Sequence, residues 1–249
     1  MKKIAIIILY LTGMTSITQA TLIAGWDFSN LGGPSTTVSA MAGSGSLDLS
    51  AFANTQQDPV SGTSVNAFSG SEASSKISPG TALSLKNSSA NGNSIIFSLD
   101  MLGYQDLVLI FATRGSSTGF NTHVWSYSTD GTTYVTLTGN NTAVTTSDFV
   151  TKTVDFTSFS ALNDDASIFI KLTVNGAGSS SGDNVFDNIQ FNAETYIAVI
   201  PEPAEYGLIS AIGLLGICGA GIWRKQRAAS TPENLPSEIR DQGFDFSLP

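Results

Sequence analysis

The stretch at residues 167–174, SIFIKLTV, alternates between apolar and other side chains at every second position. One face of an extended chain would then hold Ile168, Ile170, Leu172 and Val174. Lys171 and the neighbouring hydroxyl residues fall on the opposite face. A strict period of two is typical of a β-strand that has one face in a core and the other in solvent.

The same period recurs along the chain in short runs separated by turn-forming residues. The runs are LIAGWDF (22–28), SIIFSL (94–99), DLVLIFA (106–112), HVWSYST (123–129), TYVTLT (133–138), FVTKTVDF (149–156) and NVFDNIQF (184–191). Asp130-Gly131, between two of them, is a strong hairpin signal. We therefore predict an all-β fold, an antiparallel β-sandwich of the jelly-roll type with nine or ten strands, over residues 21–200. Residues 31–79 are expected to form long loops with one or two strands.

The amino terminus has the three parts of a secretory signal peptide. Lys2 and Lys3 precede an apolar stretch at residues 4–14, and a polar segment ends at Ala20. The apolar stretch is shorter than the roughly 20 residues that cross a bilayer. Residues 1–20 are therefore predicted to be a signal peptide cleaved after Ala20, so that the protein is exported.

A second apolar segment lies near the carboxyl terminus. Residues 206–223 contain no charged side chain, and the basic cluster Arg224, Lys225 and Arg227 follows at once. Eighteen residues in a helix span about 27 Å, just enough for a membrane. We therefore predict a transmembrane helix. The basic cluster favours the orientation in which its own end lies in the cytoplasm and the body lies outside.

Two further segments flank this predicted helix. Pro201-Glu202-Pro203 precedes it, and the two prolines hold the backbone extended so that Glu202 is presented at the outer membrane boundary. The polar residues 228–249 follow the basic cluster and are predicted to be a disordered tail. These features divide the chain into a signal peptide at 1–20, a body at 21–200, a carboxyl-terminal segment at 201–227 and a tail at 228–249.

Charge and composition exclude several classes of function. The chain has 249 residues and a net charge of −9, and the fourteen acidic side chains of residues 21–200 outnumber five basic ones. Such a surface repels nucleic acid. The one cysteine, Cys218, lies in the second apolar segment, which leaves the body without a disulfide or a thiolate metal site. The one histidine, His123, is the only base for a Ser-His-Asp scheme and lies among strand aromatics, so we expect no catalytic residues and no enzyme. A carboxylate pair of the glycosidase kind stays open as an alternative.

Asp187 is the most suggestive acidic residue. In NVFDNIQF the alternation places Val185, Asp187, Ile189 and Phe191 on one face, so a core-facing Asp187 needs hydrogen-bond donors or a cation. Asp183, Asn184 and Asn188 offer oxygen atoms nearby, of the kind that Ca²⁺ binds. The alternative is that Asp187 accepts backbone N–H bonds from a neighbouring loop.

Aromatic side chains near the predicted hairpin could stack on sugar rings, because a flat apolar ring matches the face of a pyranose. The candidates are Phe120, Trp125, Tyr127 and Tyr134. Packing in the core is the alternative for each of them.

Two motifs carry a resemblance to known folds. YSTDGTTY (127–134) followed by DNVFDNIQF (183–191) resembles the jelly-roll, galactose-binding-like and carbohydrate-binding-module folds. WDFSNLGG (26–33) is similar to segments of exported bacterial proteins. The first resemblance implies a structural Ca²⁺ near the terminal strands, which Asp27 on the first strand could join with Asp187 and Asp183. No other cofactor is expected.

The end of the chain resembles the PEP-CTERM sorting signal, in which Pro-Glu-Pro, a transmembrane segment and a basic cluster close an exported protein. This resemblance implies that an exosortase, a membrane processing enzyme, reads Pro201-Glu202-Pro203 and processes the chain there. The tail after Arg227 departs from the pattern, since such proteins generally end within a few residues of the basic cluster.

We therefore expect a non-enzymatic exported protein that passes through the inner membrane and reaches the cell surface or extracellular matrix. Extracellular polysaccharide is a further expected partner. The alternatives are a protein like a carbohydrate-binding module and a glycan-active enzyme.

Overall fold

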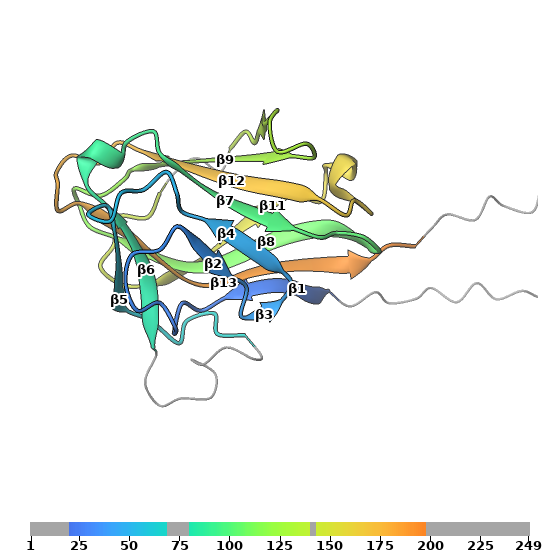
Figure 1. The fold of residues 1–249 in the computed structure, drawn as a ribbon, viewed down its shortest axis with the longest axis horizontal. Coiled ribbons are helices and arrows are strands. Elements are labelled where there is room, and N and C mark those ends of the chain that lie inside the picture. Colours follow the sequence, from blue (N-terminus) through green and yellow to red (C-terminus); the bar gives the residue numbers. More distant parts are fainter. Residues whose placement is uncertain (1–19, 69–79, 140–142, 198–249) are drawn as a thin grey trace, which may run out of the picture. The chain divides into compact units, whose positions relative to one another are not determined.

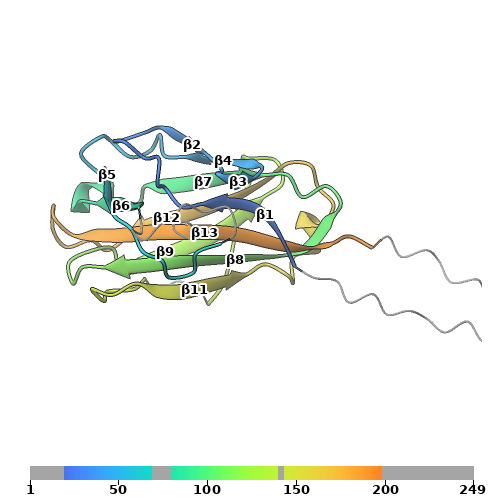
Figure 2. The same ribbon diagram turned by 90° about the horizontal axis from the view of Figure 1, so that it is seen from below.

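The computed structural model describes residues 20–68, 80–139 and 143–197. In this part of the chain thirteen strands and two short 3-10 helices form two antiparallel sheets that face each other (Figures 1 and 2). The predicted antiparallel β-sandwich is confirmed, with more strands than the nine or ten expected.

The seven-stranded sheet has the order β11-β8-β13-β1-β3. β6 extends it by pairing with Asp183–Phe186 at the start of β13, and β5 pairs with β6. Its strands are β1 (Thr21–Trp26), β3 (Ala42–Gly43), β5 (Gln57–Ser61), β6 (Thr81–Lys86), β8 (Tyr104–Gly115), β11 (Val150–Asp155) and β13 (Asp183–Thr195). Its strands pair in antiparallel fashion, and β13 lies in the middle with β8 on one side and β1 and β6 on the other.

The six-stranded sheet has the order β10-β9-β12-β7-β4-β2. Its strands are β2 (Thr37–Ser39), β4 (Gly45–Asp48), β7 (Ser94–Leu99), β9 (Thr122–Ser128), β10 (Val135–Thr136) and β12 (Ile168–Asn175). The 3-10 helices η1 (Ser88–Ala90) and η2 (Ser160–Leu162) lie in the connections.

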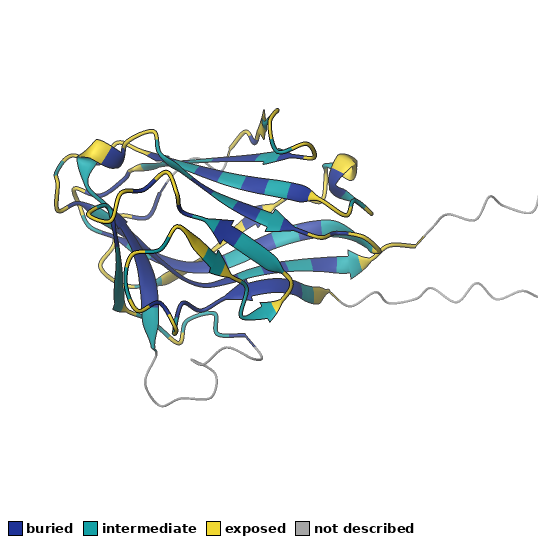
Figure 3. Ribbon diagram, in the orientation of Figure 1, coloured by how far each residue is buried: buried dark blue, intermediate teal, exposed yellow. Residues whose placement is uncertain are grey.

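The predicted alternation in β12 is confirmed. Ile168, Ile170, Leu172 and Val174 are fully buried, and the residues between them are half-buried, which gives the banded strand of Figure 3. The apolar faces of both sheets meet in one core.

Three aromatic rings join the two sheets at the centre of this core. Trp26 and Phe191 come from the seven-stranded sheet, and Phe97 comes from β7 of the other. The ring centroid of Phe97 lies 5.3 Å from that of Trp26 and 5.1 Å from that of Phe191, in edge-on arrangements. Such geometry is the favourable one for aromatic pairs, so the three rings bind the layers together.

The prediction that Asp187 lies on the same face of the strand as Ile189 and Phe191 is wrong. A β-bulge interrupts the register of β13 between Asp187 and Gln190. Ile189 and Phe191 therefore point into the core, whereas Asp187, which lies opposite Ala112 of β8, points to the outer side of the sheet. Asp187 is nevertheless fully buried, because another segment covers it.

The segment that covers Asp187 belongs to residues 31–79, a region whose sequence shows no clear strand pattern. Its described part, residues 31–68, holds four short strands, β2 to β5, instead of the one or two expected. Residues 62–68 then lie over the outer side of the seven-stranded sheet, where Phe68 is buried against Gly25 of β1. A Cβ atom at position 25 would lie 2.7 Å from the Phe68 ring, so a larger residue there would displace that ring.

The body begins and ends at the same pole of the sandwich. Thr21, the first residue of β1, pairs with Ala193 near the end of β13 (Figure 1). The predicted signal peptide, Pro-Glu-Pro motif, transmembrane helix and tail lie outside the described residues, apart from Ala20, which is exposed. Among the described residues there is no helix with the length and apolarity to span a membrane.

Candidate functional site

The outer side of the six-stranded sheet carries the first candidate site, which we call the Tyr134 face. Strand register places Lys171 of β12 between Ser126 of β9 and Ile96 of β7, and Asp48 of β4 follows Ile96. Side chains of directly paired residues share one side of a sheet. The full row contains Thr136, Ser126, Lys171, Ile96, Asp48 and Thr37. Five steps of about 4.8 Å make it about 24 Å long.

Tyr134 and Lys171 form the centre of this face. The Lys171 Nζ atom lies 3.6 Å from the centroid of the Tyr134 ring, a cation–π contact. Burial lowers the pKa of Lys171 and raises that of Tyr134, and the charges of Asp130 and Asp48 raise the pKa of Tyr134 further. The face therefore combines an aromatic ring, an ammonium group and a carboxylate within reach of one another's charge.

A tight turn holds Tyr134 in place. The Asp130 carboxylate accepts hydrogen bonds from the backbone N–H groups of Thr132 and Thr133 and from the Ser128 hydroxyl, which hold its pKa far below the usual range. The predicted hairpin is thus confirmed, although its connection is longer than the two residues of a tight hairpin, because β9 ends at Ser128 and β10 begins at Val135.

Phe169 is a member of this face that the sequence reading missed. It is half-buried on the outer side of β12, and a Cβ atom at Gly131 would lie 3.2 Å from its ring. The alternation of SIFIKLTV already places Phe169 on the same side as Lys171, so the signal was present in the sequence.

The other predicted sugar-stacking residues lie elsewhere. Phe120 and Trp125 are buried in the core, and Tyr127 points inward, where its ring centroid is 4.7 Å from that of Phe159. Of the four candidates, Tyr134 alone lies on an outer sheet face with polar neighbours.

The second candidate site is a buried pair of carboxylates, Asp27 and Asp187. Asp187 accepts hydrogen bonds from the backbone N–H groups of Thr63, at 2.7 Å, and Asn188, at 2.8 Å. Burial raises the pKa of Asp187 to about 7, the two hydrogen bonds oppose this, and the nearby charge of Asp27 adds to it. The backbone bonds of the alternative interpretation are therefore present, together with a second buried acid.

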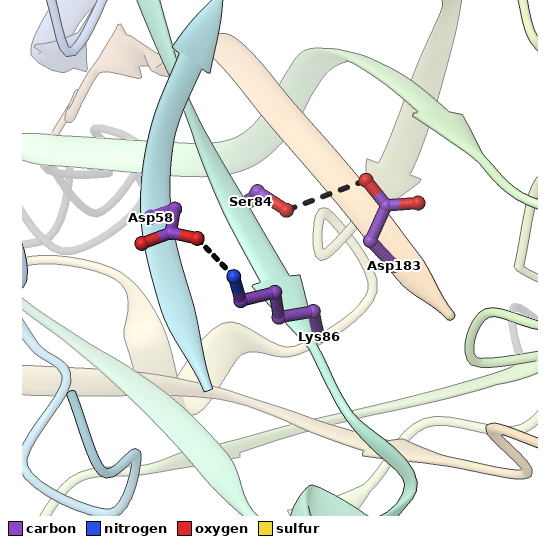
Figure 4. Close-up of polar contacts among 4 residues, drawn as sticks. All are labelled: Asp58, Ser84, Lys86 and Asp183. Atoms are coloured by element: carbon purple, nitrogen blue, oxygen red, sulfur yellow. Dashed lines mark hydrogen bonds and ion pairs between the residues drawn. The ribbon is translucent and has the colours of Figure 1, made fainter. Parts of the chain in front are cut away.

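Asp183 does not join this pair. Its carboxylate lies 3.4 Å from the Ser84 hydroxyl, next to the ion pair of Lys86 and Asp58 (Figure 4). Asp183 and Asp187 are separated by four residues along an extended strand, about 13 Å. The predicted three-residue set is thus divided between two places.

Side-chain oxygen atoms near Asp27 and Asp187 include some of the ligands that a hard cation such as Ca²⁺ needs. The Oδ1 atom of Asn188 and the Oγ atom of Ser29 are buried without hydrogen-bond partners, and each residue lies within two positions of one of the paired acids. Asp27, Asp187 and Asn188 are the residues that would hold Ca²⁺, which would neutralise the carboxylate pair. Among the described residues, no group of three or more His, Cys, Asp or Glu side chains is placed to bind a metal.

Comparisons with known proteins concern the architecture. No protein-family model matches the sequence, and no curated protein matches it. A xylan-binding domain, CBM22-1 of Paenibacillus barcinonensis Xyn10C, is similar over 73% of this chain and 100% of its own, with 9% identity and a TM-score of 0.42. TmCBM61, solved with β-1,4-galactotriose, is similar over 66% of this chain and 92% of its own, with 14% identity and a TM-score of 0.35. At these identities and TM-scores, we take the ligands of those modules as properties of those proteins alone.

Proposed function

We propose that the body of this protein binds carbohydrate, without catalysis, through the Tyr134 face. The observation that carries the proposal is the half-buried Tyr134 ring, held by the Asp130 turn beside Lys171 and Phe169 on an outer sheet surface. An aromatic ring supplies apolar contact to a sugar, and the surrounding charged groups and hydroxyls supply hydrogen bonds.

The shape of the face suits an extended polymer. Hydroxyl side chains from several strands surround the central row, including the pair Ser94 and Thr173, whose oxygen atoms lie 2.7 Å apart. Hydroxyls can both donate and accept, as sugar hydroxyls do. A row about 24 Å long offers contacts to more than one sugar unit.

Tyr134→Ala is expected to weaken polysaccharide binding by about fivefold to tenfold, because the aromatic contact is lost. Affinity electrophoresis in gels that contain xylan, galactan or soluble cellulose derivatives measures this. Tyr196→Ala is the matched control, since Tyr196 is exposed beyond the end of β13. Retardation by none of these polysaccharides, or equal retardation of the parent chain and Tyr134→Ala, would contradict the proposal.

We also propose that the body is delivered to the cell surface through the Pro201-Glu202-Pro203 segment. The pairing of Thr21 with Ala193 supports this, because the exported end and the sorting end then leave the same pole of the body.

Glu202→Gln is expected to abolish carboxyl-terminal processing in the native host, with loss of the processed form and accumulation of the full-length chain. Mass spectrometry of both termini measures it, and the mature parent protein should begin at Thr21. Glu205→Gln is the matched control, because it removes the neighbouring carboxylate and leaves the motif intact. A parent chain that still ends at Pro249 would instead indicate a permanent membrane anchor.

A further inference from the structure

A small cavity opens between the two sheets at the β9 and β11 side of the sandwich. Its volume is 120 Å³, enough for several water molecules or one small organic group. Phe111, Trp125 and Val154 form apolar walls, and all three are almost fully buried. Apolar walls of this kind lower the local dielectric constant and so strengthen electrostatic contacts made against them.

Two buried polar atoms in this wall have no hydrogen-bond partner in the described structure. His123 of β9 is 3% exposed and its Nε2 atom makes no hydrogen bond, and the same holds for the Oγ1 atom of Thr113 on β8, which is fully buried. Leaving a buried polar group unpaired costs about 1–3 kcal/mol. Two such groups lining one cavity therefore point to something that fills it.

Lys152 supplies the positive charge of the cavity. It is opposite Phe111 in the pairing of β11 with β8, so its side chain leaves the sheet on the inner side, toward β9. It lies close enough to His123 to act on it electrostatically. That charge and, more strongly, burial lower the pKa of His123 to about 4, so the imidazole is neutral at pH 7.

Two simpler explanations cover part of this arrangement. β11 is an edge strand, and an inward-pointing lysine there opposes pairing with another chain. That would explain the inward position of Lys152, but it does not explain why the Nε2 atom of His123 and the Oγ1 atom of Thr113 have no hydrogen-bond partner. Ordered water in the cavity would supply partners for the two polar atoms, but it does not explain why the charged side chain of Lys152 lies on the inner side of the sheet.

We propose that this cavity binds one carboxylate group, held by the Lys152 ammonium, the His123 imidazole N–H and the Thr113 hydroxyl. All three groups can donate a hydrogen bond, which is what an anion requires. A single negative charge matches the one cationic side chain of the lining. The ligand could be a free carboxylic acid or the uronic acid unit of a polysaccharide, and this site is separate from the Tyr134 face.

The single histidine of the chain makes the test direct. The full chain, without a histidine tag, is titrated at pH 7 with acetate and with glucuronate, and the imidazole Cε1–Hε1 resonance is followed by NMR. We expect a saturable shift with at least one of the two acids, and none with glucose or with sodium chloride at equal ionic strength. Acetate alone would indicate a free small acid, whereas glucuronate alone would indicate a sugar acid.

Lys152→Gln is expected to weaken this binding by about tenfold or more, since a charge-assisted hydrogen bond is lost. The residue is exposed on an edge strand, so the fold should persist. Thr113→Val is a second variant that removes one donor at nearly constant shape. Lys86→Gln removes the same charge at β6 and should bind as the parent does, as should Tyr134→Ala. Absence of a saturable shift with either acid, or equal binding by Lys152→Gln and the parent, would overturn the proposal and leave the cavity to water.

Discussion

In calcium-free buffer, we expect Asp187→Asn to become more stable relative to the parent chain as the pH rises from 4 to 7. The difference between their free energies of unfolding should change by on the order of 4 kcal/mol over that range. The pKa of Asp187 is raised from 3.8 to about 7 in the folded protein. Between these values the folded parent binds more protons than the unfolded one, so its free energy of unfolding falls as the pH rises. Asparagine has no proton to lose and removes that fall. Urea denaturation at several pH values measures the difference between the two proteins.

The parent chain alone would conceal this effect because His123 acts in the opposite direction. The pKa of His123 is lowered from 6.5 to about 4 on folding. The unfolded chain binds the extra proton in that window, so this contribution to stability rises with pH. The two groups nearly cancel from about pH 4 to pH 6.5. The difference between variant and parent isolates Asp187, and Asp183→Asn, the same change on the same strand outside the carboxylate pair, is the control.

Calcium provides the second arm of that experiment. If Asp27 and Asp187 hold Ca²⁺, a chelator lowers the melting temperature of the parent at pH 7 and leaves Asp187→Asn unchanged. An equal melting temperature of the parent with and without chelator removes the calcium site. A difference profile that stays flat from pH 4 to pH 7 in calcium-free buffer refutes the raised pKa itself.

Phe97→Ala is expected to lower the free energy of unfolding by about 3–5 kcal/mol, because it removes the aromatic contacts between the two sheets and leaves a cavity there. Phe97 is fully buried and meets both Trp26 and Phe191. Chemical denaturation followed by tryptophan fluorescence measures the loss. Ile96→Ala, one position along the same strand but on the outer side, should cost much less, and equal costs would show that the core is not centred on these rings.

The period of the apolar residues predicted most of the central strands, since burial of one sheet face is a local property of sequence. It also predicted which side of β12 is buried. It failed at Asp187, because a β-bulge shifts the register by one residue and nothing in NVFDNIQF distinguishes a bulged strand from a regular one. The very short strands β2 to β5 are too brief for a period to be visible.

The candidate sites depend on register between strands that are distant in sequence. Tyr134 could be named from the sequence, but its contact with Lys171 arises because β9 lies between β10 and β12. Likewise, Lys152 and His123 belong to different sheets and meet only across the sandwich. Residue types and their spacing cannot show such neighbours, whereas the alternation of SIFIKLTV is enough to place Phe169 on the outer side with Lys171.

The position of β13 has a mechanical consequence for a protein held at its carboxyl end. Tension on that end would enter the body along β13, which is thirteen residues long and is bonded to β8 on one side and to β1 and β6 on the other. To extract it, hydrogen bonds of both ladders must be broken together in shear instead of one after another. A polymer pulling on the far sheet would thus load the strand that is bonded along both of its edges.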